Sequence, residues 1–359
     1  METISFARGI PAPECLPVAE LADCAKAALG RDGLVALSYG STLGYDPLRE
    51  WIAQRHGVEP ERVLVTNGSL QAFHFVLDSL GGRVIVERPT YDRPRKILLA
   101  AGAEFDEVRV DEHGLDVEQL ERALASGPKP SFVYTIPTFQ NPTGSTLSEE
   151  RRRRLAELAR EQSVAVLEDD PYGLVRFEGE PLPSLFDLEG GENVMYSSSF
   201  SKTIAPGLRV GYAVVPAALG AKLEELAAST YITPALLAQA TVFEFLRRGL
   251  FEPNLERGRL LLRARRDAML DALERELAGR ARWNRPEGGY FLWLELPGTV
   301  DTGELLVQAA RAGVTFVPGE DFGGTPASAR LAFSFVSPEE IDEGVRRLAQ
   351  LVAAAPAAV

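Results

Sequence analysis

Lys202 stands where a lysine could do chemistry. It is one of only five lysines in the chain, and it follows the serine-rich run 197–201 directly after an apolar segment. The carboxyl end of a strand in an open α/β sheet is the usual place of a ligand crevice. A lysine that loses its proton easily can form a Schiff base with a carbonyl compound. Because most lysines are solubilising surface groups, this interpretation depends on the neighbouring residues.

Groups suited to a phosphate monoester lie close to Lys202 in the sequence. Ser199 and Ser201 precede it, and Arg209 follows it by seven residues. Two hydroxyls and a guanidinium group together match the oxygens of a phosphate. The sequence therefore predicts a phosphate subsite beside this lysine.

A second anion site is predicted at residues 66–69. There an apolar strand turns through Gly68 into a helix that begins at Ser69. The free N–H groups at the start of a helix face and bind anions. A plain strand-to-helix turn is the alternative interpretation of this loop.

The elements that must position these groups follow from the hydrophobic pattern. Short apolar runs alternate with amphipathic segments, which is typical of a parallel sheet covered by helices. Ser148 is the expected N-cap of a helix, and the run Arg151 to Arg154 within that helix is expected to be a solvated face. We expect strands at 63–66, 83–87, 132–136, 164–168, 194–198 and 211–215, and helices at 69–80, 93–101, 117–125 and 149–162.

The last third of the chain predicts a second, smaller domain of α+β type. A length of 359 residues agrees with two domains, because single cores stop growing at about 250 to 300 residues. Helices are expected at 217–227, 234–248 and 253–278, the third as a bridge between domains; strands are expected at 283–296, 314–318 and 330–336, with helices at 302–312 and 338–353.

Composition argues against several partners. A net charge of −13 disfavours nucleic acid, whose binders concentrate positive charge on one face. No run reaches the roughly 20 apolar residues of a membrane helix, so we expect no membrane partner and a cytoplasmic location. Cys15 and Cys24 match no metal or redox motif, and the three histidines lack the spacing of metal hydrolases. We therefore expect no metal.

Four motifs in register resemble a known family. Asp169 comes 28 residues after Asn141, Lys202 follows 33 residues later and Arg209 seven after that. This order and spacing resembles the class I/II aminotransferases of fold type I, which depend on pyridoxal 5'-phosphate. The motifs are Asn141-Pro142-Thr143-Gly144, Asp169-Asp170-Pro171-Tyr172, Ser199-Phe200-Ser201-Lys202 and Pro206-Gly207-Leu208-Arg209.

The resemblance extends from Gly9 to Arg330. Stretches 4–14 and 39–49 are similar to the subgroup of 2-aminoadipate and multi-substrate aminotransferases, which includes the C-terminal domains of MocR-type regulators. The resemblance implies an α/β fold with a mostly parallel seven-stranded sheet between helices. The implied segments are a large cofactor-binding domain at 46–255, a small α+β domain at 256–359 after a bridging helix at about 253–278, and an N-terminal segment, 1–45, shared by the small domain and the dimer interface.

Catalytic roles come from the resemblance. It implies that Lys202 holds the cofactor as a Schiff base and then, once freed, moves a proton between the substrate Cα and the cofactor. The strand pattern does not choose among the three adjacent acids at 168–170. The family's Asp-x-x-Tyr spacing selects Asp169, with Tyr172, and implies that Asp169 keeps the pyridine nitrogen protonated.

The remaining cofactor contacts are likewise implied by the family. Tyr172 and Asn141 would hydrogen-bond the phenolic oxygen, although Asn before Pro is also ordinary turn chemistry. The Tyr91 ring would stack on the pyridine, with core packing as the alternative. Leu70 stands where relatives often have Gln, which leaves only a backbone contact. The implied phosphate ligands are Gly68, Ser69, the amide of Leu70, Ser199, Ser201, Arg209 and Tyr39 of the neighbouring subunit.

Arg330 is the candidate for binding the substrate carboxylate. Period two in 330–335 places Arg330 on the face opposite Leu331. The family implies a bidentate contact, helped by Asn141 and the backbone of Gly9, whereas a surface ion pair is the alternative. Arg8 is expected either to read an acidic side chain or to cover the site, and an exposed arginine without a role is equally open.

The predicted function is a homodimeric aminotransferase with a ping-pong mechanism between an amino acid and a 2-oxo acid. One expected pair is glutamate and 2-oxoglutarate, with 2-aminoadipate or an aromatic or branched-chain amino acid as the other donor. A lyase or decarboxylase on the same cofactor is the main alternative. A regulator that senses pyridoxal phosphate is the other alternative, and it requires a DNA-binding domain ahead of this one.

Overall fold

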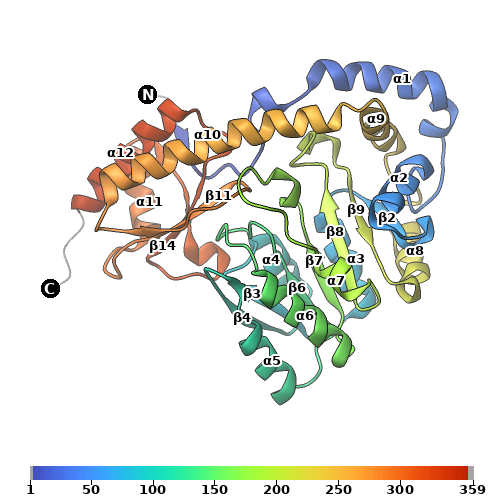
Figure 1. The fold of residues 1–359 in the computed structure, drawn as a ribbon, viewed down its shortest axis with the longest axis horizontal. Helices are drawn as coiled ribbons and strands as arrows, with labels where there is room; N and C mark the ends of the chain where they lie inside the picture. Colours follow the sequence, from blue (N-terminus) through green and yellow to red (C-terminus); the bar gives the residue numbers. More distant parts are fainter. Residues whose placement is uncertain (1–2, 355–359) are drawn as a thin grey trace.

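The computed structural model describes residues 3–354, and an eight-stranded sheet forms its centre (Figure 1). The five strands β4-β3-β6-β7-β8 run parallel, β9 is antiparallel to both its neighbours, and the short β5 forms a hairpin with β4. The implied mostly parallel sheet of seven strands is confirmed, with β5 added at its edge. In spatial order the strands are β2 (Val63–Thr66), β9 (Gly211–Val214), β8 (Val194–Ser199), β7 (Val166–Asp169), β6 (Phe132–Thr135), β3 (Val84–Arg88), β4 (Phe105–Asp111) and β5 (Gly114–Leu115).

Helices cover both faces of this sheet. Val84 and Val86 face one hydrophobic cluster, which includes side chains of α3 and α8, while Ile85 between them faces the other. Strands buried on both sides are continuous apolar runs, and these runs made the central strands predictable. The helices around the sheet are α2 (Asp46–His56), α3 (Ser69–Leu80), α4 (Asp92–Ala100), α5 (Val117–Ser126), α6 (Glu149–Glu161), α7 (Leu185–Glu189) and α8 (Ala217–Tyr231).

One residue of α6 differs from the expected solvated face. Ser148 caps the helix through Arg151 N as predicted, but Arg152 is only 1% exposed. The Arg152 guanidinium donates to Pro137 O at 2.7 Å and to Thr138 Oγ1 at 2.7 Å. The helical period turns this one arginine inward, where carbonyl and hydroxyl oxygens satisfy it.

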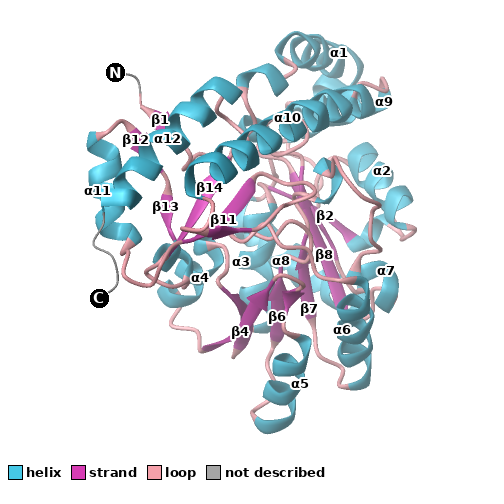
Figure 2. Ribbon diagram, turned by 60° about the vertical axis from the view of Figure 1, so that its left-hand side comes forward, coloured by secondary structure: helices cyan, strands magenta, loops and turns pink. Residues whose placement is uncertain are grey.

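The second domain combines a four-stranded antiparallel sheet, β10-β11-β14-β13, with a two-stranded parallel pair, β1 with β12. The 27-residue α10 runs along one side of the molecule from this domain towards α1 and α9 (Figures 1 and 2). The bounds are β1 (Ile4–Ser5), β10 (Arg282–Trp283), β11 (Phe291–Glu295), β12 (Val314–Thr315), β13 (Val317–Pro318), β14 (Ser328–Ala332), α1 (Val18–Ala36), α9 (Leu236–Arg247), α10 (Phe251–Leu277), α11 (Thr302–Arg311) and α12 (Pro338–Ala354).

Several expected strands of this domain are wrong in extent. The segment 283–296 is broken into β10 and β11 by a loop that contains Pro286, Gly288 and Gly289. The segment 314–318 is divided between two sheets, and the strand expected at 330–336 ends at Ala332. Proline and glycine explain the interruption of the segment 283–296, because both residues favour turns and loops. The division of 314–318 at residue 316 depends instead on tertiary packing.

Within residues 3–354, no helix is both long and apolar enough to cross a membrane. In the same range, no group of three or more metal-ligating side chains could hold an ion. Cys15 and Cys24 are both free thiols.

Candidate active site

Lys202 follows β8 and lies between two aromatic rings. Its Nζ donates a hydrogen bond to Gly9 O at 2.7 Å and sits 5.6 Å from the Tyr172 ring and 5.3 Å from the Tyr290 ring. Burial, followed by the charges of Arg330 and Arg209, lowers the pKa of Lys202 to about 8. A substantial fraction of its amino group is therefore neutral near pH 8, which a nucleophilic lysine requires.

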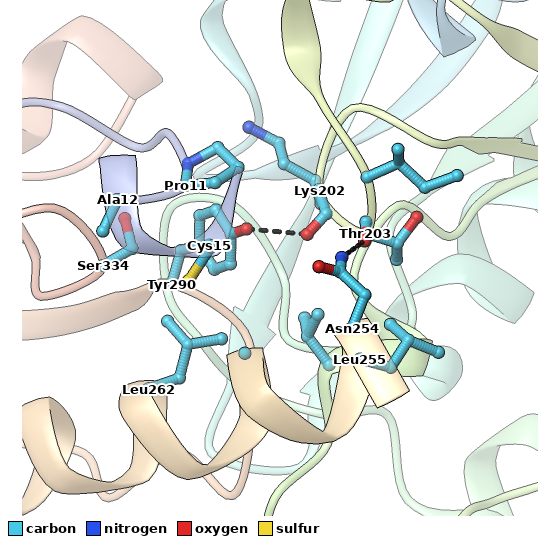
Figure 3. Close-up of a pocket in the computed structure, with 13 residues that line it drawn as sticks. Pro11, Ala12, Cys15, Lys202, Thr203, Asn254, Leu255, Leu262, Tyr290 and Ser334 are labelled. Carbon is cyan, nitrogen blue, oxygen red and sulfur yellow. Dashed lines mark hydrogen bonds between the residues drawn. The ribbon is translucent and has the colours of Figure 1, made fainter. Parts of the chain in front are cut away.

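The Lys202 amino group points away from a small cavity behind it (Figure 3). This cavity of about 20 Å³ is bounded by Tyr290, Asn254 and Leu262, and it has room for about one water molecule. The Tyr290 hydroxyl donates to Lys202 O at 2.8 Å. The backbone of Lys202 is thus held from behind while its side chain is presented to the opposite side.

Asp169 ends β7 with one carboxylate oxygen free. It is 6% exposed, and its Oδ2 accepts a hydrogen bond from the Tyr134 hydroxyl at 2.9 Å. Its Oδ1 is buried with no partner among the described residues. Desolvation raises the pKa of Asp169 to about 7, against the lowering effects of the Tyr134 and Ser69 side chains and of the Lys202 charge. A buried carboxylate oxygen without a hydrogen-bond partner is able to accept a donor from a bound group.

The two neighbouring acids accept hydrogen bonds from backbone and side-chain groups of the chain itself. Glu168 accepts from Leu185 N at 3.1 Å and Phe186 N at 2.9 Å. Asp170 accepts from Gly173 N at 2.7 Å and from the Tyr196 hydroxyl at 3.0 Å. The three adjacent acids therefore differ in surroundings, and Asp169 is the one of them with a buried oxygen left unpartnered.

The predicted phosphate ligands from three strand ends meet at one place. Arg209 donates to Asn67 O at 2.9 Å and to Ser201 Oγ at 3.3 Å, and Ser199 Oγ donates to Ser201 Oγ at 2.8 Å. Gly68 has a φ of +83°, and a Cβ there would lie 2.4 Å from the Arg209 guanidinium. The positive φ favours glycine at this position, and a Cβ would also displace the Arg209 guanidinium. The helix α3 begins immediately afterwards with no side chain capping its first amides, so their N–H groups are available to an anion.

Arg330 and Asn141 lie together, an arrangement that agrees with the family resemblance. Arg330 Nη1 donates to Asn141 Oδ1 at 2.9 Å and Nη2 donates to Ala7 O at 2.9 Å. The guanidinium packs against the rings of Phe291 at 4.2 Å and Phe322 at 4.8 Å. Burial lowers its pKa. No carboxylate of residues 3–354 lies within salt-bridge distance, so the surface ion pair expected as the alternative is wrong.

The N-terminal segment carries Gly9 into the site, and the side chain of the adjacent Arg8 is exposed. A Cβ on Gly9 would lie 2.5 Å from the Phe291 ring, which excludes a side chain there. The Arg8 side chain is exposed and lies 5.1 Å from the Phe335 ring, a cation–π contact.

The other predicted site residues occupy varied surroundings. Tyr172 is 4% exposed, and its ring also contacts Tyr290 and Phe291. Tyr91 and Leu70 are half-buried. Tyr39 is 84% exposed in the single chain.

Sequence reasoning missed Tyr134, Tyr290 and Ala7. The signal for Tyr134 was a tyrosine inside an otherwise apolar buried strand, because a buried tyrosine hydroxyl needs a partner. Tyr290 follows a Gly-Gly pair, but its partner is a backbone carbonyl 88 residues away. The contact of Ala7 is also made by its backbone, and a backbone contact cannot be predicted from the type of the residue.

The large mixed sheet, the smaller α+β domain and a lysine at the end of β8 define a class: this is the architecture of fold-type I transferases that depend on pyridoxal phosphate. Residues 16–348 match the family model for aminotransferases of class I and II. The chain belongs to this family and is a pyridoxal-phosphate-dependent aminotransferase of amino acids and 2-oxo acids.

Known relatives are similar over nearly their full length. A 2-aminoadipate transaminase of Thermus thermophilus is 42% identical over 96% of this chain and 89% of its own. The crystal structure of a Thermus thermophilus alpha-aminoadipate aminotransferase, complexed with N-(5'-phosphopyridoxyl)-L-leucine, superposes with a TM-score of 0.93 at 40% identity, covering 98% of this chain and 92% of that one. A kynurenine aminotransferase structure from Pyrococcus horikoshii gives a TM-score of 0.94 at 35% identity, covering 100% and 92%.

Proposed function

We propose that Lys202, Asp169 and the ring of donors around Arg209 hold pyridoxal phosphate. The observation that carries this proposal is the vacant, buried Oδ1 of Asp169, because the protonated ring nitrogen of the cofactor is the donor it lacks. The two serines, Arg209 and the first amides of α3 suit the phosphate. Tyr172 and Asn141 are assigned to the phenolic oxygen and Tyr91 to the ring face.

The bound cofactor supplies the electron sink that lets the substrate Cα–H bond break. The protein's own part is to move the proton. With a pKa of about 8, Lys202 takes a proton from Cα as the free amine and returns it as the ammonium. The hydrogen bond from the Tyr290 hydroxyl to Lys202 O holds the backbone of Lys202 in place. The side chain therefore extends from a fixed Cα position.

We assign the substrate α-carboxylate to Arg330 and Asn141. Arg330 has a buried Nε with no partner, and its other nitrogens touch only an amide oxygen and a carbonyl. A carboxylate offers two oxygens to such a fork. Holding the carboxylate this firmly favours loss of the Cα proton over loss of carbon dioxide, so transamination is preferred to decarboxylation. Lyase chemistry, which also begins with loss of the Cα proton, is the second candidate.

The substrate pair is proposed from the relatives. Their names include 2-aminoadipate and kynurenine, and the pair glutamate/2-oxoglutarate is retained from the sequence, with aromatic and branched-chain donors as further candidates. Arg8, beside Gly9 and outside the carboxylate clamp, is the proposed reader of an acidic side chain.

We also propose a homodimer in the cytoplasm, with large domain 46–255, small domain 256–359 and the segment 1–45 shared between the small domain and the interface. The support is an exposed apolar surface around Tyr39, which loses its exposure if a second copy covers it. Leu34, Leu37 and Ile232 are 88%, 71% and 63% exposed, and Gly40 is hydrogen-bonded to Thr233 beside Ile232. Tyr39 would then reach the phosphate of the partner.

A donor screen tests the substrate proposal. The loaded enzyme is mixed with one amino acid at a time and without a 2-oxo acid acceptor, and the oxo acid released per active site is measured. An aminotransferase releases one equivalent and stops, whereas a lyase or decarboxylase continues to turn over. Continued release of product without an acceptor would contradict transamination.

A further inference from the structure

Glu87 is a buried carboxylate with no role in the chemistry assigned above. It lies in β3 and is 1% exposed. Its Oε1 accepts hydrogen bonds from Thr135 Oγ1 at 2.5 Å and Ile136 N at 3.1 Å, and its Oε2 accepts from Gln140 Nε2 at 2.9 Å. In all three contacts the carboxyl oxygens of Glu87 accept, and these hydrogen bonds oppose the burial that raises the pKa of Glu87 to about 7.

Gln140 connects Glu87 to two loops that carry site residues. Its Nε2 also donates to Pro89 O at 2.8 Å, two residues before Tyr91. Its Oε1 accepts from Thr143 N and from Thr143 Oγ1, both at 2.8 Å. Its backbone carbonyl accepts from Gly144 N at 2.6 Å. Gln140 therefore closes the 140–144 loop from the inside and ties it to the loop that leads to Tyr91.

The residue fixed between these bonds is Asn141, whose Oδ1 accepts from Arg330 at 2.9 Å. Because Gln140 and Thr143 hold the loop on both sides of Asn141, the carboxyl end of β3 reaches the carboxylate clamp through one continuous set of hydrogen bonds. We propose that Glu87 and Gln140 form a positioning pair, which sets Asn141 in place for the clamp and the segment that carries Tyr91. The inference rests on the proposed role of Arg330 and Asn141.

Glu87→Gln tests the pair with little change in volume. An amide at position 87 presents an N–H group to Gln140, and if Gln140 turns to accept it, the N–H group of Gln140 then faces Thr143 N. Whichever way the amides turn, one donor meets another. In the cofactor-free protein, we expect the amides of Thr143 and Gly144 to exchange hydrogen about tenfold faster than in the wild type, the scale of one lost hydrogen bond.

In the loaded enzyme, Glu87→Gln should raise KM for the amino-acid donor about tenfold and lower kcat by a smaller factor, because the substrate clamp is disturbed more than the proton transfer. Gln140→Leu approaches the pair from the other side and leaves the bonds of Glu87 to Thr135 and Ile136 in place. It should give the same change in KM. The increase in KM of the double variant should be no larger than the larger increase of the two single variants, because both substitutions disrupt the same hydrogen-bonded pair.

Glu189→Gln is the matched control. Glu189 is a carboxylate only 5% exposed that accepts from the backbone N–H groups of Glu192 and Asn193, at the start of β8 and outside this network. It should lower thermal stability without changing loop exchange or KM. Thermal unfolding of all variants is measured alongside.

The proposal is wrong if Glu87→Gln and Gln140→Leu change exchange and KM no more than Glu189→Gln does. Faster exchange with an unchanged KM would also overturn it, because the loop would then move without disturbing the clamp. The exchange measurement needs neither cofactor nor substrate, so it tests the pair separately from the role assigned to Arg330. Should Glu87→Gln fail to fold, Gln140→Leu decides the question by the same two readouts.

Discussion

The phosphate end and the carboxylate end of the site are built in different ways. At the phosphate end, Gly68, Ser201 and Arg209 come from loops at one edge of one sheet and contact one another. At the carboxylate end, Arg330 lies on β14 of the small domain and reaches Asn141 after β6 and Ala7 near the N-terminus. The first end is local to one sheet, whereas the second depends on how two domains and the N-terminal segment pack. Changes at the two ends should therefore affect different measured quantities.

Among the variants that keep Lys202, the largest effect is expected from Asp169→Ala, at the position between the two ends. Removing the partner of the ring nitrogen should lower kcat by roughly a hundredfold to a thousandfold, the scale of deleting one charge-stabilising group. Steady-state kinetics at saturating cofactor measures the change. An unchanged kcat would mean that a different acid serves the cofactor.

Arg330→Ala should affect the carboxylate end alone. We expect kcat/KM for the amino-acid donor to fall about a hundredfold, because a charged hydrogen-bonding partner is worth about 3 kcal/mol. The affinity for pyridoxal phosphate should stay at the wild-type value, as measured by titration of the cofactor-free protein. Equal losses of kcat/KM and of the affinity for pyridoxal phosphate would show that the two ends of the site are not independent.

Arg209→Ala is the reciprocal test at the phosphate end. The affinity for pyridoxal phosphate should weaken about thirtyfold, which corresponds to about 2 kcal/mol for a charge-assisted bond. With cofactor at saturation, KM for the donor should return to the wild-type value. An unaltered cofactor affinity would remove the phosphate assignment.

Arg8→Ala should give the smallest effect, because an exposed charge pair contributes about 1 kcal/mol or less. We expect the preference for acidic over neutral donors to fall about fivefold, measured as a ratio of kcat/KM values for glutamate and leucine. The same ratio in variant and wild type would leave Arg8 without a role in specificity.

The two ends also differ in how far the sequence predicted them. The sequence predicted most of the phosphate end, because strand ends and glycine turns mark the edge of a sheet. The residues predicted in this way are Gly68, Ser199, Ser201 and Arg209. Helix 69–80 was also placed with its observed bounds. Asn141 and Arg330 were paired only through the family resemblance, since no local pattern joins residues 189 positions apart.

The parts that sequence reasoning missed share a physical cause. The strand β4 buries only Val108 fully among its seven residues, so its apolar signal is weak. We predicted Arg152 at the surface because of its charge, although the helical period places it on the buried face. There its guanidinium donates to carbonyl oxygens. The contacts of Ala7 and Gly9 use backbone oxygens, which carry no residue-type signal. Tertiary packing decides each of these cases.

The most direct test of the account compares wild type with Lys202→Ala in a single half-reaction. Each protein is incubated with pyridoxal phosphate, and its absorption spectrum is recorded before and after glutamate is added without a 2-oxo acid. The account predicts that the wild type shows the band of the lysine-bound cofactor and converts it to that of pyridoxamine phosphate, with one equivalent of 2-oxoglutarate released. Lys202→Ala should show neither the lysine-bound band nor catalytic turnover. A Lys202→Ala protein that transaminates at the wild-type rate would contradict the central claim.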